Sequence, residues 1–398
     1  MNRQLSNSPV LRQISVRAVM ERLLRDGASS RAGLSRVTGL SKQTISEVML
    51  VLAERGWVRE SGKIAGGVGR TAIRYEIDPR AGFALGLDLG ASTLRGVLCD
   101  IGGTIVAERQ VAAEGGAARL TAQARSLKDD LLRAASASPD LVQAVTAATP
   151  GVMNAQGRLD LAPSLPGVGD RDFAGELRAA LECPVMFEND INAAALGEYW
   201  EAGQSGYNHF AFISIGTGVG LGLVLNGTLL RGAGHAAGEI AYLPLGADPF
   251  APQNVERGTL ENTLGADGIL HRFRLAGGSA SATVRDIFDQ FNAGERPALD
   301  TINETASLTA RAVLSVTAIV DPDRVVLGGN IGVRPELVRL VNELMPQLQR
   351  RPTPVEASRL GPRATVLGAA AMSLGEMHNS LFSTPELPGR IGLPTLRQ

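Results

Sequence analysis

Three glycine-containing turns beside short apolar runs constrain the fold of this chain most strongly. The first follows the run 83–87, the second lies between 210–215 and 223–225, and the third follows 324–327. Glycine lets a backbone turn tightly and approach a phosphate closely, although a polar β-turn or a tight hairpin explains any one of them alone. Together they predict a two-lobed α/β fold, whose phosphate-binding candidates are Asp88, Gly90, Ser92, Gly216, Thr217, Gly218, Gly220, Gly328 and Gly329.

The first 80 residues carry a different pattern, which predicts three helices and a β-hairpin. A helix whose apolar face runs from Val16 to Leu24 ends at Gly27, and a short second helix contains Leu34 and Val37. After the turn 38–40, Ser41 is placed to cap a third helix, which has a buried stripe from Ile45 to Leu52. The glycine-rich loop 62–70 and the alternating run 73–77 complete the pattern of a winged helix-turn-helix.

Charge supports a nucleic-acid partner for this N-terminal head. Residues 1–80 carry 14 Lys or Arg against 7 Asp or Glu, whereas the rest of the chain carries 25 against 33. A basic head on an acidic body predicts contact with DNA, and a small helical interaction domain is the alternative. The side chains that we expect to meet base edges or phosphates are Ser41, Lys42, Gln43, Thr44, Ser46, Glu47, Lys63 and Arg70.

The segment 188–198, ENDINAAALGE, is the candidate centre of chemistry in the body. Asp190 directly precedes an expected helix at 191–200, so it has the position of an N-cap. It also has the residue type of a general base, and both roles are compatible. Two cysteines, Cys99 and Cys183, are too few for a disulfide framework, and no apolar signal or spanning segment is evident. We therefore expect a soluble, cytoplasmic protein.

The body resembles the ROK family of repressors, uncharacterised frames and sugar kinases, which has the actin-like (ribonuclease H-like) ATPase fold. The resemblance covers about residues 81–377. It depends on the order and spacing of seven short segments: 88–92, 150–151, 165–167, 188–190, 216–220, 238–240 and 260–261.

This resemblance implies a lobe 1 at 81–192, a lobe 2 at 193–362, and a helix at about 363–378 that returns to lobe 1. The winged helix-turn-helix occupies 1–80, and the proline- and glycine-rich tail 379–398 is expected to drape over the surface or to be disordered. The resemblance also implies that Asp190 is the catalytic base if the chain is an active kinase. The sugar-binding residues that it implies are Asn189, Asp190, Glu239, Tyr242 and Glu261.

The chain departs from its family at two sites. Many members bind zinc through one histidine and three cysteines, and the aligned residues here are Tyr242, Pro252, Asn254 and Thr259. None is a usual zinc ligand, so we expect no zinc and a loop at 243–258 held by packing and prolines, with Tyr242 replacing the histidine. The phosphate turn has Ala91 and Ser92 where family kinases have glycine and threonine, and 146–149 lacks the family's glycines. The kinase machinery is thus eroded.

The hypothesis that follows is a sugar-responsive transcriptional regulator, a repressor, that binds operator DNA as a homodimer or homotetramer. Its effector is a sugar or sugar derivative, it requires no cofactor, and activation in place of repression stays open. A two-fold dimer would read half-sites roughly 10–21 base pairs apart. The alternatives are an ATP-dependent sugar kinase that uses Mg²⁺ and has a regulatory DNA-binding head, and a protein-interaction module.

Overall fold

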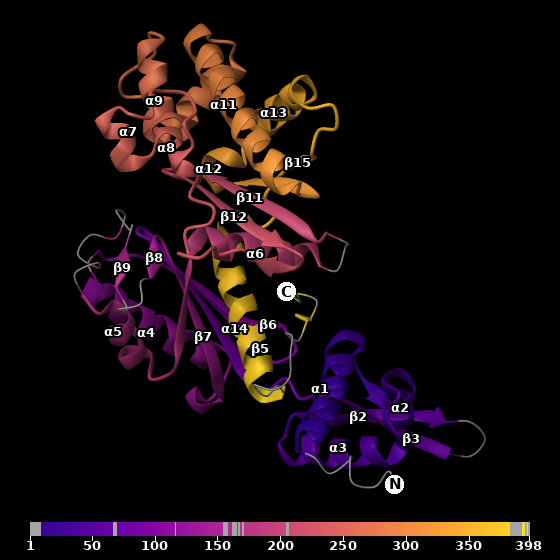
Figure 1. Cartoon of the computed structure of the whole chain (residues 1–398). Helices are drawn as coiled ribbons and strands as arrows, with labels where there is room; N and C mark the ends of the chain where they lie inside the picture. The colour runs from indigo at the N-terminus through magenta and orange to yellow at the C-terminus, as the bar shows by residue number, and fades with distance from the viewer. Residues whose placement is uncertain are drawn as a thin grey trace. The chain divides into compact units, whose positions relative to one another are not determined.

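The computed structural model describes residues 9–66, 70–115, 117–153, 158–160, 165, 168, 171–203, 207–382, 392–394 and 396 (Figure 1). The chain forms two compact units. Unit 1 comprises Met1–Glu188 and Ala369–Gln398, and unit 2 comprises Asn189–Gly368. The domain limits expected from the sequence stay predictions. None of the described helices combines the length and the apolarity that a bilayer crossing requires.

The N-terminal head contains three helices and a small antiparallel sheet, consistent with a winged helix-turn-helix. Gly39 ends the second helix in the left-handed conformation with φ of 73°, and Ser41 caps the third by accepting from the Thr44 N–H, as predicted. The hairpin starts earlier than expected, because most of the predicted loop 62–70 is strand, while 67–69 lie outside the described residues. Its elements are α1 (Pro9–Asp26), β1 (Ser29–Ser30), α2 (Arg31–Thr38), α3 (Lys42–Glu54), β2 (Val58–Gly66) and β3 (Arg70–Ile77).

Helical periodicity explains the core of the head. The predicted apolar stripes of α1 and α3 are buried, since Met20, Ile45 and Leu52 are each fully shielded from solvent. Val37, which the sequence placed with Leu34 on the short second helix, stays 46% exposed. Val37 lies about 60° around the helix axis from Leu34, toward the edge of the buried face.

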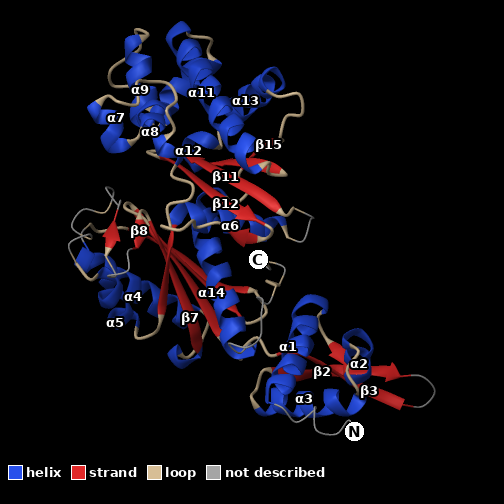
Figure 2. Cartoon of the chain, in the orientation of Figure 1, coloured by secondary structure: helices blue, strands red, loops and turns tan. Residues whose placement is uncertain are grey.

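The rest of unit 1 is built around a five-stranded sheet in the order β10-β7-β4-β5-β6 (Figure 2). Strand β4 is buried along its whole length and pairs antiparallel with β5 and parallel with β7. Helix α14 is anchored to this sheet by Ser373, whose hydroxyl donates to Leu85 O at 2.8 Å. The elements are β4 (Phe83–Leu89), β5 (Thr93–Asp100), β6 (Ile105–Ala112), α4 (Ala117–Ala134), η2 (Pro139–Leu141), β7 (Val142–Thr149), β8 (Val152–Met153), β9 (Leu159–Asp160), α5 (Phe173–Leu181), β10 (Val185–Asn189) and α14 (Ala364–Phe382).

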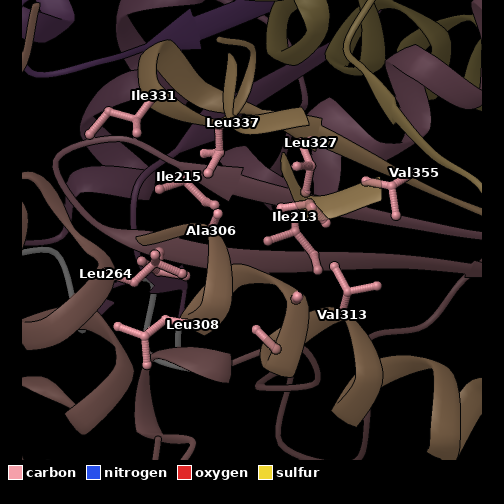
Figure 3. Close-up of a cluster of buried hydrophobic side chains, with 14 of the residues drawn as sticks. Ile213, Ile215, Leu264, Ala306, Leu308, Val313, Leu327, Ile331, Leu337 and Val355 are labelled. Atoms are coloured by element: carbon pink, nitrogen blue, oxygen red, sulfur yellow. The ribbon is translucent and has the colours of Figure 1, made fainter. Parts of the chain in front are cut away.

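Unit 2 has a second five-stranded sheet, in the order β13-β12-β11-β14-β15, with helices packed on it. Its core joins β11 and β14 to the long helix α11 through side chains such as Ile213, Leu327 and Val313 (Figure 3). The elements are α6 (Asp190–Ala202), β11 (His209–Ile215), β12 (Val219–Leu225), β13 (Thr228–Leu229), η3 (Ile240–Tyr242), α7 (Pro252–Arg257), α8 (Thr259–Leu264), α9 (Ala266–Leu275), α10 (Val284–Asn292), α11 (Arg296–Val320), β14 (Arg324–Gly328), α12 (Gly329–Gly332), α13 (Pro335–Leu348), β15 (Val355–Ala357) and η4 (Gly361–Arg363).

Several predicted boundaries are wrong in one direction, because regular structure extends further than the sequence indicates. Asp88 belongs to strand β4 and not to the turn after it, and the second glycine turn shrinks to residues 216–218. The expected loop 243–258 contains helix α7. Helix α14 continues to Phe382, into the segment expected to be tail, most of whose remaining residues lie outside the described part of the chain.

Candidate functional site

The N-terminus of helix α6 is the centre of the candidate site, and its cap is Asn189. The Asn189 Oδ1 accepts from the Ile191 N–H at 2.9 Å and from the Asn192 N–H at 3.1 Å. The prediction that Asp190 caps this helix is therefore wrong by one residue. Asp190 is the first helical residue, and its own Oδ1 also accepts from the Ile191 N–H at 2.9 Å. Because Asn189 Oδ1 serves the helix, a ligand would meet the Asn189 side chain through its amide nitrogen.

Burial makes Asp190 an unusual carboxylic acid. The pKa of Asp190 is raised from 3.8 to about 6, mainly by desolvation and also by the negative charge of Glu239. The backbone N–H groups of Ile191 and of Asp190 itself act in the opposite direction, because they stabilise the carboxylate. A group with a pKa near 6 is ionised at neutral pH and accepts a proton more readily than an ordinary aspartate.

Two glutamates complete a cluster of three carboxylates in unit 2. Partial desolvation of its side chain raises the pKa of Glu239, and so does the charge of Glu261. Glu261 on α8 also has a raised pKa because of burial, although its Oε2 accepts from the Val219 N–H at 3.2 Å. Glu239 itself remains exposed, so its shift is a weaker indication of a closed site than that of Asp190. The structure thus brings together three of the five predicted sugar-binding residues as electrostatic neighbours.

A glycine that cannot be replaced positions Glu239. Gly238 has φ of 97°, and a Cβ on it would collide with the carbonyl of Leu221 in β12. The Leu221 N–H donates to Gly238 O at 3.1 Å, so the turn carrying Glu239 is held directly against the sheet. Glu239 is therefore fixed by backbone contacts, as a binding residue on a rigid scaffold should be.

Tyr242 lies at the end of the short helix η3 and is 48% exposed. Its hydroxyl donates to Glu256 O at 3.4 Å, which places it beside α7. The predicted role of Tyr242 in sugar binding stays a prediction. The residues around Tyr242 bear on zinc binding, because Tyr242 aligns with the position at which many members of the family named above have a zinc-binding histidine.

Amide side chains hold the segment where a zinc site would lie. Asn254 is buried, and its Nδ2 donates to Asp248 O at 2.8 Å while its Oδ1 accepts from Asn262 Nδ2 at 2.9 Å. An amide engaged in this way does not fit a zinc ligand, nor does the tyrosine hydroxyl beside it. Among the described residues, no three or more His, Cys, Asp or Glu side chains are grouped to hold a metal ion. The loop therefore depends on hydrogen bonds, where the sequence indicated only packing and prolines.

The glycines of the second turn have packing roles that the sequence did not reveal. A Cβ on Gly222 would lie 2.6 Å from the Ala195 Cβ, and one on Gly220 would lie 2.9 Å from the Ile191 Cγ1. Both glycines are in strand β12, where they let α6 approach the sheet. A Cβ on Gly218 would lie 2.7 Å from Glu261 Oε2. The glycines of this turn and of strand β12 thus make room for α6 and for the Glu261 side chain. Phosphate binding by Gly216, Thr217, Gly218 and Gly220 stays a prediction.

The other predicted phosphate-binding residues also have local explanations. In unit 2, a Cβ on Gly328 or Gly329 would collide with Phe212 or with the carbonyl of Ile215. In unit 1, a Cβ on Gly90 would lie 2.9 Å from Thr93 O, which is the close approach of a tight turn. Ser92 is exposed at this turn.

Asp88 has a cationic partner that the sequence reasoning missed. Arg95 Nη1 donates to Asp88 Oδ2 at 3.1 Å, and both side chains are largely buried. The two residues face each other in the antiparallel register of β4 and β5, so counting outward from the turn would have paired them. Because Arg95 already neutralises Asp88, a divalent cation such as Mg²⁺ gains less here than at an unpaired carboxylate.

The predicted DNA-binding residues gather at the start of α3 and on the hairpin. Ser41, Lys42, Gln43 and Glu47 are exposed, while Thr44 and Ser46 are partly buried. Gln43 Nε2 donates to Glu47 Oε1 at 3.1 Å, and Ser46 Oγ donates to Lys42 O at 2.9 Å. Lys63 is exposed on β2, and Arg70 begins β3, although its side chain lies outside the described residues.

Comparison with known proteins gives the relatives of this chain. The ROK family model matches residues 84–376. A putative xylose repressor of Caldicellulosiruptor sp. strain Rt8B.4 is 26% identical over 393 residues, covering 94% of this chain and 98% of that protein. A kanosamine kinase of Amycolatopsis mediterranei is 31% identical over 292 residues, covering 69% of this chain and 94% of that protein.

A solved structure shares the fold along almost the whole chain. The crystal structure of a ROK family transcriptional regulator, a homologue of the E. coli MLC protein, aligns with a TM-score of 0.74 at 21% identity. The alignment covers 94% of this chain and 98% of that one. With its two α/β units and the family's motifs in order, the chain belongs to the ROK family.

Proposed function

We propose that this chain is a sugar-responsive DNA-binding transcriptional regulator that represses carbohydrate-metabolism genes. The observation that carries the proposal is the carboxylate cluster of Asp190, Glu239 and Glu261 in a chain that begins with a helix-turn-helix. A carboxylate accepts hydrogen bonds from two adjacent hydroxyl groups, which suits the vicinal diols of a sugar. The relative named as a putative xylose repressor supports a pentose such as D-xylose as the first effector to test.

The cluster binds a sugar through ionised acceptors. Above pH 6 Asp190 is ionised, so it accepts hydrogen bonds from sugar hydroxyls, with Glu239 and Glu261 as further acceptors. The charge of Glu239 raises the pKa of Asp190, and the charge of Glu261 raises that of Glu239, so the hydroxyl donors of a sugar would relieve part of this repulsion. Asn189 contributes an amide donor, and Tyr242 takes the place of the family's histidine.

The DNA-binding role belongs to the exposed start of α3 with the hairpin β2–β3. In a homodimer or homotetramer, two such heads would read half-sites of an operator. A sugar that binds one arrangement of the protein better than another shifts the population and so changes operator affinity. This regulation needs no cofactor, and the amide-held loop around Asn254 supports a zinc-free protein.

Polarisation measurements on labelled DNA from the region upstream of the protein's own gene test this proposal. We expect salt-sensitive binding that D-xylose or another sugar from a panel weakens severalfold. The Glu239→Gln variant should lose the sugar response, while Glu256→Gln, which changes an exposed glutamate on α7, should keep it. DNA binding that no sugar alters, or equal responses of both variants, would refute the assigned sugar site.

A sugar kinase is the second candidate, and Asp190 is the observation in its favour. A pKa of about 6 suits a base that takes the proton of a sugar hydroxyl, and a kanosamine kinase is among the relatives. Bound ATP with Mg²⁺ would supply the transferable phosphoryl group. Against this stand the Asp88–Arg95 ion pair and the use of the Val219 N–H by Glu261. A coupled ATP-consumption assay over hexoses and pentoses distinguishes the two functions. Robust turnover that is lost in Asp190→Asn would establish the kinase.

A further inference from the structure

Helix α14 is continuous from Ala364 to Phe382 (Figure 1). Its two ends belong to different units. Residues up to Gly368 are part of unit 2, and residues from Ala369 onward are part of unit 1. A single helix transmits a shift or rotation of one end to the other, since its backbone hydrogen bonds make it stiff over a few turns. What each end contacts within its own unit therefore matters.

Within unit 2, the beginning of α14 lies directly against the backbone of α6. A Cβ on Gly197 would collide with the carbonyl of Ala364, and one on Gly368 would collide with the carbonyl of Ala193. With no side chain between the two helices, there is no soft layer to absorb a displacement. Close-packed backbones of this kind move together.

A buried carboxylate ties α6 to the segment that enters α14. Glu198 is only 4% exposed, and it accepts from the Leu360 N–H at 3.0 Å, from the Arg359 N–H at 3.3 Å and from the Ser358 hydroxyl. Charge-assisted hydrogen bonds are strong, and losing one leaves a buried charge poorly compensated. At the other end of α6, the Thr365 hydroxyl donates to Asp190 O at 3.4 Å. The helix that begins with Asp190 is thus attached to α14 at several points.

Within unit 1, the end of α14 contacts the head through two aromatic rings. The buried ring of Phe382 packs edge-to-face on Trp57, with the ring centroids 4.9 Å apart. Beside it, His378 Nε2 lies 2.8 Å from Ile101 O, and burial lowers the pKa of His378 to about 4, so this imidazole is neutral at neutral pH. The contact between Phe382 and Trp57 is therefore one of ring against ring.

Trp57 connects this contact to α3, the helix to which we assign DNA binding. Its backbone N–H donates to Leu52 O at 2.9 Å, in the last turns of α3, and its backbone carbonyl accepts from the Asp78 N–H at 3.0 Å, after the hairpin. The guanidinium of Arg55 also lies over its ring, 4.8 Å from the centroid. A displacement of Trp57 therefore acts on both the third helix and the hairpin of the head.

We infer that α14 transmits the state of the sugar site at Asp190 to the DNA-binding head, through α6 at one end and the Phe382–Trp57 contact at the other. The inference rests on the proposed function for the nature of the signal. Phe382 and Glu198 act as positioning residues that touch neither sugar nor DNA. An edge-to-face aromatic pair can shift an equilibrium by about 2- to 10-fold, which overlaps the usual range of allosteric coupling.

The chain contains two tryptophans, Trp57 and Trp200, so a full-length Trp200→Phe protein reports on Trp57 alone. The first measurement needs no ligand. Glu198→Gln should change the emission maximum of Trp57 and raise its acrylamide quenching constant about twofold. Asp323→Asn is the control for loss of a carboxylate acceptor, because Asp323, although exposed, also accepts from two backbone N–H groups, of Asn208 and His209, and lies outside α6 and α14. It should leave Trp57 unchanged.

Circular dichroism and thermal melting check that the variants fold, and Ser358→Ala replaces Glu198→Gln if that protein does not. In a Phe382→Leu background, the Glu198→Gln change should have no further effect on Trp57, because the contact that carries it has been altered. The inference would be overturned if the Trp57 signal did not respond to Glu198→Gln, or to Ser358→Ala used in its place, or if it responded equally to Asp323→Asn.

The second measurement uses D-xylose. Calorimetry establishes whether the sugar binds, and Trp57 fluorescence establishes whether the head responds. Binding with a Trp57 response that Phe382→Leu abolishes, at unchanged sugar affinity, supports the inference, while binding without any response overturns it. If D-xylose does not bind, the proposed effector is wrong, and the ligand-free comparison of Glu198→Gln with Asp323→Asn still decides the role of α14.

Discussion

Replacing Asp190 by asparagine should stabilise the protein against unfolding at neutral pH, although it removes the central residue of the sugar site. Burial raises the pKa of Asp190 from 3.8 to about 6, so the ionised side chain is disfavoured in the folded state. A shift of this size corresponds to roughly 3 kcal/mol at most. Asp190 as a whole residue keeps some contact with solvent, and the helix dipole favours a negative charge in the first turn, so we expect about 1–2 kcal/mol at pH 8.

The gain in stability of Asp190→Asn should depend on pH in a definite direction. A raised carboxyl pKa means that the folded state holds the proton more tightly than the unfolded chain does. The penalty is therefore absent below about pH 4, grows as pH rises from the unfolded to the folded pKa, and is complete above about pH 6. The advantage of Asp190→Asn should follow the same course, small at pH 4 and constant from about pH 7 upward.

Urea unfolding at several pH values measures this directly. Trp200 lies within α6, so in a Trp57→Phe background its fluorescence follows the element that carries Asp190. The reasoning is refuted if Asp190→Asn is less stable than its parent at pH 8, or if the difference does not change with pH.

Asp286 provides a control of opposite sign. Hydrogen bonds from the backbone and hydroxyl of Thr283 lower its pKa, as part of a capping box at the start of α10. A lowered carboxyl pKa stabilises the folded state above the unfolded pKa, and that contribution is lost as pH falls through the folded pKa. Asp286→Asn should therefore destabilise the protein at neutral pH, and the difference should shrink in acid.

Three further predictions follow from the site and its supports. D-xylose affinity measured by calorimetry should fall up to tenfold per pH unit below pH 6, because Asp190 must be ionised to accept hydroxyl donors, and a flat profile would contradict that role. Gly222→Ala should destabilise by about 1–3 kcal/mol in thermal unfolding, because its Cβ would lie 2.6 Å from that of Ala195. Gly234→Ala, with nothing within 4 Å, should have little effect, and equal losses would disprove the packing role. Lys42→Ala should reduce the salt slope of DNA binding by about 1 if Lys42 contacts a phosphate, and an unchanged slope would remove it from the interface.

Local patterns in the sequence predicted the head well. Helical periodicity located the buried faces of α1 and α3, and a serine before an apolar run identified the cap at Ser41. These features depend on residues a few positions apart, so no knowledge of the tertiary fold is needed to find them.

Features that depend on contacts between residues far apart in the sequence were not predicted. Gly222 resembled part of a phosphate loop because its actual neighbour, Ala195 on α6, is far away in the chain. The importance of Glu198 and Phe382 likewise arises from segments 160 or more residues distant. The Asp88–Arg95 ion pair could have been predicted from the sequence, since the register of a hairpin determines which residues oppose each other.

The amide pair of Asn254 and Asn262 has a consequence for the setting in which this protein works. A structural metal site is either occupied or unoccupied. It therefore links the conformation of a protein to the cell's supply of that metal and to the redox state of its thiol ligands. Hydrogen bonds between amides and backbone carbonyls carry no such link. We therefore expect the loop beside the proposed sugar site to keep its shape in a chelator or in a mild oxidant, and the proposed sugar response to be independent of the zinc supply.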